Sequence, residues 1–111
     1  MQTRKSYQKV NPELLYAEVR DFTLKQGATI GEAKMETYAL PDDSSTFMTR
    51  ATLTFKMADG KECLRAHIVG SVKSETKLML DVDEKLFPAD KLTTLLGDLD
   101  FIFGSYELKP N

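Results

Sequence analysis

The sequence predicts an α+β fold in which a curved antiparallel β-sheet meander of four to six strands packs against one long N-terminal helix and one short C-terminal helix. Apolar residues recur at helical spacing after Asn11, and they alternate with polar residues through much of the following stretch. The predicted order is (β)-α-β-β-β-β-α-β. Four consecutive strands joined by short loops form an antiparallel meander, whose apolar face must be covered by the helices. We expect residues 1–111 to form a single α+β domain, because domains of about 100–150 residues are the commonest.

The long helix is predicted over 12–26. Asn11 is a favourable N-cap, Pro12 fits the first turn, and Glu13 complements the positive end of the helix dipole. Gly27 ends the helix. Three apolar residues follow the cap at helical spacing, namely Leu15, Val19 and Phe22.

A β-hairpin is predicted around Asp59-Gly60, because Asp-Gly between two alternating runs is the strongest short-range hairpin signal. A two-residue loop pairs Ala58 with Lys61. The register that follows places apolar residues opposite one another on the inner face: Phe55 with Leu64, Leu53 with Ala66, and Ala51 with Ile68. The turn chemistry and the hydrophobic pattern select this register independently.

The following strand is predicted over Thr76–Glu84, with Leu78, Leu80 and Val82 inside. A three-residue loop at Ser74-Glu75-Thr76 places Val72 opposite Leu78 and Ile68 opposite Val82.

Two further strands are predicted in the sheet, a short strand at Lys5–Val10 and a strand at 28–40. In the second of these, Ala33, Met35 and Ala39 are predicted to point inward, and Glu36 falls opposite Arg50 on the outer face. The polar stretch 41–46 is predicted to be a loop that can serve as a binding loop.

The C-terminal part is predicted to hold the short helix, beginning at Pro88, and then a final strand at Phe101–Leu108. Apolar residues on both faces of that strand indicate burial on both sides. We favour burial in the core, and a homodimer through a strand edge or sheet face is the alternative. Cystatin-like and helix-grip (TATA-box-binding-protein-like) architectures share this order of elements, but no motif ties the chain to a family, and topology alone supplies no function.

Composition excludes several classes of protein. Fifteen basic and seventeen acidic residues leave a formal net charge of −2, which disfavours nucleic acid and anionic membranes as partners. The single cysteine excludes an intrachain disulfide. The polar N-terminal stretch has no apolar run of signal-peptide type, and no stretch reaches the 20 or so apolar residues of a membrane helix. We therefore expect a cytoplasmic protein.

The outer face of the predicted sheet carries the candidate ligand- or partner-binding residues. These are Arg50, Lys56, Arg65, His67 and Asp83. The predicted register places His67 opposite Asp83, and a His–carboxylate pair can act as a general base. A solvated cross-strand charge pair is the interpretation we favour, because such surface pairs are common. The basic stripe lacks the interleaved aromatic residues typical of a nucleic-acid-binding sheet.

No catalytic residue, metal or cofactor is predicted. Cys63 is expected on the outer face, about 13 Å along its strand from His67, which is too far for a catalytic dyad or for joint binding of a metal ion. Asp81 and Asp83 resemble the start of a calcium loop, but Leu86 and Leu92 stand where that loop needs glycine and glutamate.

These observations favour a non-enzymatic binding or interaction module whose partner is another protein or a second copy of the chain. The first alternative is a carrier or small enzyme that holds a hydrophobic small molecule in a cavity between sheet and helices. The second is a nucleic-acid-associated protein that uses the basic residues of the sheet face.

Overall fold

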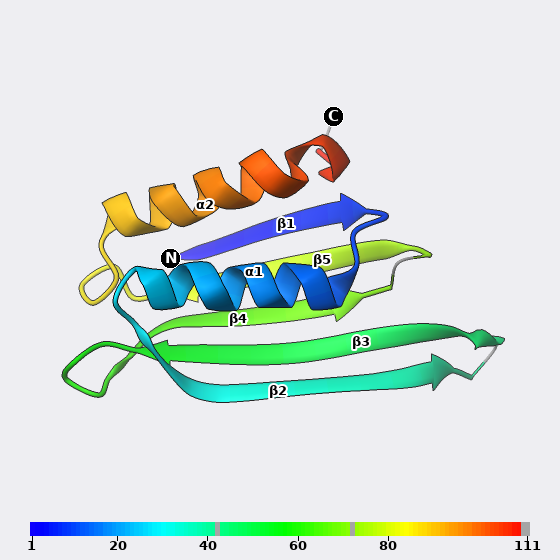
Figure 1. The fold of residues 1–111 in the computed structure, drawn as a ribbon, viewed down its shortest axis with the longest axis horizontal. Helices are drawn as coiled ribbons and strands as arrows, with labels where there is room; N and C mark the ends of the chain where they lie inside the picture. Colours follow the sequence, from blue (N-terminus) through cyan, green and yellow to red (C-terminus); the bar gives the residue numbers. More distant parts are fainter. Residues whose placement is uncertain (42, 72, 110–111) are drawn as a thin grey trace.

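The computed structural model describes residues 1–41, 43–71 and 73–109, and it contains a five-stranded antiparallel sheet with two helices on one face (Figure 1). The elements, in chain order, are β1 (Gln2–Gln8), α1 (Pro12–Lys25), β2 (Thr29–Leu40), β3 (Asp43–Lys56), β4 (Glu62–Gly70), β5 (Glu75–Val82), α2 (Ala89–Phe103) and a 3₁₀ turn (Gly104–Tyr106). The strand order in the sheet is β1-β5-β4-β3-β2. The predicted fold class is confirmed, and so is the predicted order of elements from β1 to α2.

The helices form a second layer over part of the sheet. Helix α1 contacts β3, β4 and α2, and α2 runs beside β1 (Figure 1). The Tyr7 ring of β1 meets the Phe103 ring of α2 edge-on, with 6.0 Å between centroids. The core between the layers is filled by large side chains that are fully buried, including Leu15, Phe55 and Phe87.

Helix α1 forms where the sequence predicts it. The Asn11 side chain accepts a hydrogen bond of 2.8 Å from the Glu13 backbone N–H, and Pro12 occupies the first turn. The helix ends at Lys25, and Gly27 follows with a φ of 98°, a conformation that glycine adopts without strain. The buried face of the helix comprises Pro12, Leu15, Val19 and Thr23.

The β3–β4 hairpin has the predicted register but a different turn. Met57 accepts a hydrogen bond from the Gly60 N–H and donates one to the Lys61 carbonyl, so the loop has three residues and Ala58 does not pair with Lys61. Only Gly60 has a positive φ in this loop, at 80°. A bulge at Cys63 adds one residue to β4 and restores the predicted pairs, such as Phe55 with Leu64.

The register between β4 and β5 differs from the prediction by four residues. Ile68 lies opposite Leu78, and Leu64 lies opposite Val82, whereas the sequence reading placed Ile68 opposite Val82. Both registers keep the same side chains on the inner face, so the hydrophobic pattern does not distinguish them. Val72, expected to face Leu78, lies outside the described residues.

Strand β2 keeps the predicted pairing but is not buried. Glu36 lies opposite Arg50 as predicted, and Met35 lies opposite Ala51. Because α1 contacts β3 and β4, the inner face of β2 remains uncovered, and Met35 is 37% exposed. The loop expected at 41–46 is shorter than predicted, since β3 begins at Asp43.

The predicted strand at Phe101–Leu108 is wrong over most of its length. Helix α2 continues to Phe103, because Leu99 and Phe103 extend the buried stripe of the helix by one turn. The final strand is reduced to a bridge between Glu107 and Tyr7, next to a hydrogen bond of 2.7 Å from the Leu108 N–H to the Ser6 carbonyl. The first strand also starts earlier than predicted, at Gln2.

Candidate functional site

The face of the sheet opposite the helices, here called the outer face, is not covered by any described segment of the chain. Its side chains come from alternate positions of all five strands. Cross-strand pairing places Thr52, His67, Met79 and Arg4 in one row across β3, β4, β5 and β1. A five-stranded surface of this kind is rigid, because backbone hydrogen bonds hold its side chains in fixed register.

Four of the five predicted site residues lie on the outer face. Arg50 is exposed and lies opposite Val69. Lys56 lies against Gly31, where a Cβ atom would come within 3.1 Å of the lysine Cε. The bulge of β2 at Gly31 thus leaves space for this lysine.

The predicted pairing of His67 with Asp83 is wrong. His67 lies opposite Met79, and Asp83 is four residues further along the chain, which amounts to about 13 Å in extended backbone. The Asp83 side chain instead accepts a hydrogen bond of 3.0 Å from the Lys85 N–H, in the turn that follows β5. The four-residue difference in register explains why His67 and Asp83 lie apart, because it changes the partner of every β4 residue on β5.

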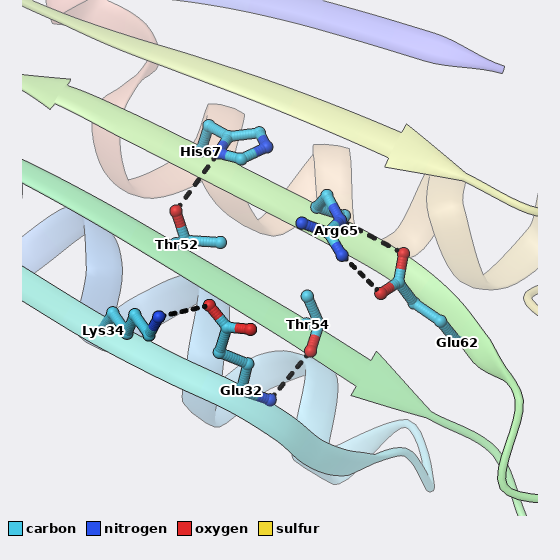
Figure 2. Close-up of polar contacts among 7 residues, drawn as sticks. All are labelled: Glu32, Lys34, Thr52, Thr54, Glu62, Arg65 and His67. Atoms are coloured by element: carbon cyan, nitrogen blue, oxygen red, sulfur yellow. Dashed lines mark hydrogen bonds and ion pairs between the residues drawn. The ribbon is translucent and has the colours of Figure 1, made fainter.

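His67 has a hydroxyl neighbour rather than a carboxylate. Its Nδ1 atom lies 3.3 Å from the Thr52 Oγ1 atom (Figure 2). A general base of the His–carboxylate type needs an acidic partner at this nitrogen. The arrangement therefore supports hydrogen bonding to a ligand better than proton abstraction.

Arg65 is held by an acidic neighbour on its own strand. Its Nε and Nη2 atoms donate hydrogen bonds to the two carboxylate oxygens of Glu62, at 3.2 and 2.9 Å (Figure 2). This hydrogen bonding raises the pKa of Arg65. Lys34 lies 3.6 Å from a Glu32 carboxylate oxygen on β2. These pairs reduce the positive potential of this part of the outer face and make it a poor phosphate-binding surface.

Sequence reasoning missed an apolar strip on the outer face, here called the outer apolar stripe and formed by Met48, Val69 and Met79. The three side chains are half-buried and lie diagonally across β3, β4 and β5. Val69 and Met79 also line a shallow depression together with His67, Arg4 and Lys77. The sequence does contain a signal for this stripe: Met48, Val69 and Met79 are apolar residues at outward-facing positions that the alternating pattern otherwise fills with polar residues.

Cys63 is not on the outer face, contrary to the prediction. The bulge turns the side chain inward, where it is 1% exposed. Burial raises the pKa of the Cys63 thiol, so the nucleophilic thiolate is suppressed. Within the described ranges, no three His, Cys, Asp or Glu side chains come together in a way that could hold a metal ion.

Among the described residues, large buried side chains such as Phe55 and Phe87 occupy the space between sheet and helices. The depressions described here open to solvent, and each is lined in part by charged side chains.

In the helical layer, Glu18 of α1 forms a side-chain hydrogen bond with Asp98 of α2. This hydrogen bond, together with burial, raises the pKa of Glu18 to about 7. That contact joins two helices far apart in sequence, so alternation patterns do not predict it.

Comparisons with protein families, with curated proteins and with solved structures found no match. No helix in the described part of the chain combines the length and the apolar character needed to cross a membrane.

Proposed function

We propose that the protein is a non-enzymatic binding module whose outer sheet face binds an acidic segment of another protein that also carries apolar side chains. The observation that carries this proposal is the outer apolar stripe on a sheet face that no described segment covers. Apolar groups on an uncovered, rigid surface are typical of a protein-binding site. We also propose that the protein acts in the cytoplasm, since its one thiol, Cys63, is unpaired.

The charges around the stripe indicate the chemistry of the partner. Arg50 lies beside Val69, and Arg4 and Lys77 line the depression that contains Met79. One carboxylate, Glu75, also lines that depression, and the cations there outnumber it. The carboxylates of Glu62 and Asp81 lie towards the other end of β4 and β5. Charge complementarity favours an acidic partner and speeds its association.

The alternatives have less support. A carrier needs an enclosed apolar cavity, and the buried core between sheet and helices is filled by side chains such as Phe55. A nucleic-acid-binding face needs unpaired cations and stacking aromatic rings, and on the outer face Arg65 is engaged by Glu62.

The test is a titration of the ¹⁵N-labelled protein with a synthetic peptide in which two leucines are flanked by glutamates. We expect amide shifts centred on Val69 and Met79. Met79→Glu should weaken binding by about tenfold or more, through like-charge repulsion and the loss of an apolar contact. The matched control is Phe101→Glu, at an exposed apolar position of α2, which should bind like the wild type.

A second peptide, with lysines in place of the glutamates, tests the charge argument. Weaker binding of this peptide supports the proposal. Equal binding of both peptides, an unchanged affinity of Met79→Glu, or shifts confined to the helical layer would each refute it. Salt-dependent binding of single- or double-stranded DNA to the outer face would show that the nucleic-acid alternative is correct.

A further inference from the structure

Strand β2 is an unpaired edge of the sheet. The strand order places β1 and β2 at the two edges, and the outer edge of β1 already contacts Glu107 and Leu108. Nothing in the described ranges pairs with the outer edge of β2, which lies beyond both helices in Figure 1. Ten of its twelve residues are exposed. Its backbone groups are therefore available to another strand.

Most of β2 lacks the bulges and prolines that commonly prevent an edge strand from pairing with another chain. The bulge at Gly31 interrupts its pairing with β3 near one end, and from Glu32 to Ala39 the pairing is regular. That stretch contains no proline. The charged residues in it alternate in sign along the outer face: Glu32, Lys34 and Glu36. Such a pattern repels some strands and matches others.

The alternating charges of β2 match a second copy of β2. In an antiparallel pair with a two-fold axis at Met35, Lys34 of each chain lies opposite Glu36 of the other, so two opposite-charge pairs form. The same register places Ala33 opposite Thr37. Paired residues lie equally far from Met35 on the two strands, so each outer-face side chain lies opposite another outer-face side chain. Opposite charges directly across an antiparallel pair stabilise it.

Three neighbouring two-fold registers of the same kind are less favourable. An axis at Lys34 opposes lysine to lysine and Glu32 to Glu36, and an axis at Glu36 opposes glutamate to glutamate. An axis at Ala33 runs into the bulge at Gly31 after two residues. The charge pattern disfavours the axes at Lys34 and Glu36, and the bulge disfavours the axis at Ala33, so together they favour the axis at Met35 over these three.

We propose that two copies of the chain associate through antiparallel pairing of their β2 edges about a two-fold axis at Met35, forming a continuous ten-stranded sheet. Lys34 is available for this role, because its 3.6 Å contact with Glu32 is a surface ion pair and its side chain is 71% exposed. The pairing would also bring together the uncovered inner faces of both β2 strands, including Met35.

Charge reversal provides a test that does not depend on loss of folding. Lys34→Glu opposes Glu36 of the partner with glutamate, and Glu36→Lys opposes Lys34 with lysine. Each variant should dimerise about tenfold more weakly than the wild type, since two attractive pairs become repulsive. A mixture of the two variants restores both opposite-charge pairs and should form a heterodimer. Lys85→Glu, at an exposed position after β5, is the matched control for net charge.

Sedimentation velocity over a series of protein concentrations measures these outcomes, and circular dichroism verifies that each variant is folded. A wild-type dimer that each single reversal weakens and the mixture restores supports the proposal. A wild type that remains monomeric at every concentration overturns it. Dimers that survive both reversals, or a mixture that stays monomeric, also overturn it, because the interface then lies elsewhere on the surface.

Discussion

The carboxyl groups of Glu18 on α1 and Asp98 on α2 meet across the contact between the two helices. The hydrogen bond to Asp98 is the largest cause that raises the pKa of Glu18 to about 7, followed by burial and by repulsion from the same carboxylate. The Asp98 Oδ2 atom is buried without a donor among the described residues, and a proton on Glu18 is the donor available beside it. We therefore expect the packing of the helical layer to depend on pH.

We predict that Glu18→Gln removes a pH dependence of stability. The pKa of Glu18 rises from 4.5 to about 7 on folding, so its stabilising effect is complete below pH 4.5 and is lost as the pH rises through 7. At pH 8 the glutamine variant should be more stable than the wild type by about 1 kcal/mol, a value reduced for solvent screening.

Urea denaturation at pH 5 and at pH 8 measures this effect. Glu84→Gln removes an exposed carboxylate outside the helices and should keep the pH profile of the wild type. Identical profiles for the wild type and Glu18→Gln would show that the two carboxyl groups do not share a proton.

We predict opposite effects for alanine at two glycines. Gly97 lies inside α2, where an added Cβ meets nothing within 4 Å, so Gly97→Ala should stabilise the protein by about 0.5–1 kcal/mol. Gly60 has a φ of 80°, so Gly60→Ala should destabilise it by about 1 kcal/mol or more. Denaturation midpoints measure both changes. A neutral or destabilising Gly97→Ala would argue against a helix that continues through this position.

We predict that the Cys63 thiol is protected in the native protein. The bulge places it in the core, and burial raises its pKa, so a thiol-specific reagent should react only through unfolding. The reaction rate should then rise with urea. A Lys61→Cys variant, with its new thiol at an exposed turn position, provides the rapid reference. Rapid labelling of Cys63 without denaturant would place this side chain on the outer face.

Much of the fold could be predicted from local patterns. The cap at Asn11 and Pro12 set the start of α1, and the alternation in β3 and β4 predicted which side chains face the helices. The β3–β4 register was correct even though the turn was not, because the bulge at Cys63 compensates for the extra loop residue. A local pattern therefore predicts the face of a residue better than the geometry of the loop beside it.

The candidate site was predicted only in part. Arg50, Lys56, Arg65 and His67 share the outer face, because period-two alternation determines the side of a strand. Asp83 does not lie beside His67 as predicted. A register change of four residues keeps every side chain on the same face of the sheet but gives it different cross-strand neighbours.

Local sequence patterns were sufficient to predict the order of elements from β1 to α2, the N-terminal boundary of α1 and the inner and outer faces of the central strands. Packing between distant segments established the length of α2, the inward turn of Cys63, the exposed edge of β2 and the contact of Glu18 with Asp98. The physical reason is that helix capping and strand alternation act between near neighbours in the chain. The register of β5, the end of α2 and the contacts between helices depend on packing between segments far apart in sequence, which local patterns do not encode.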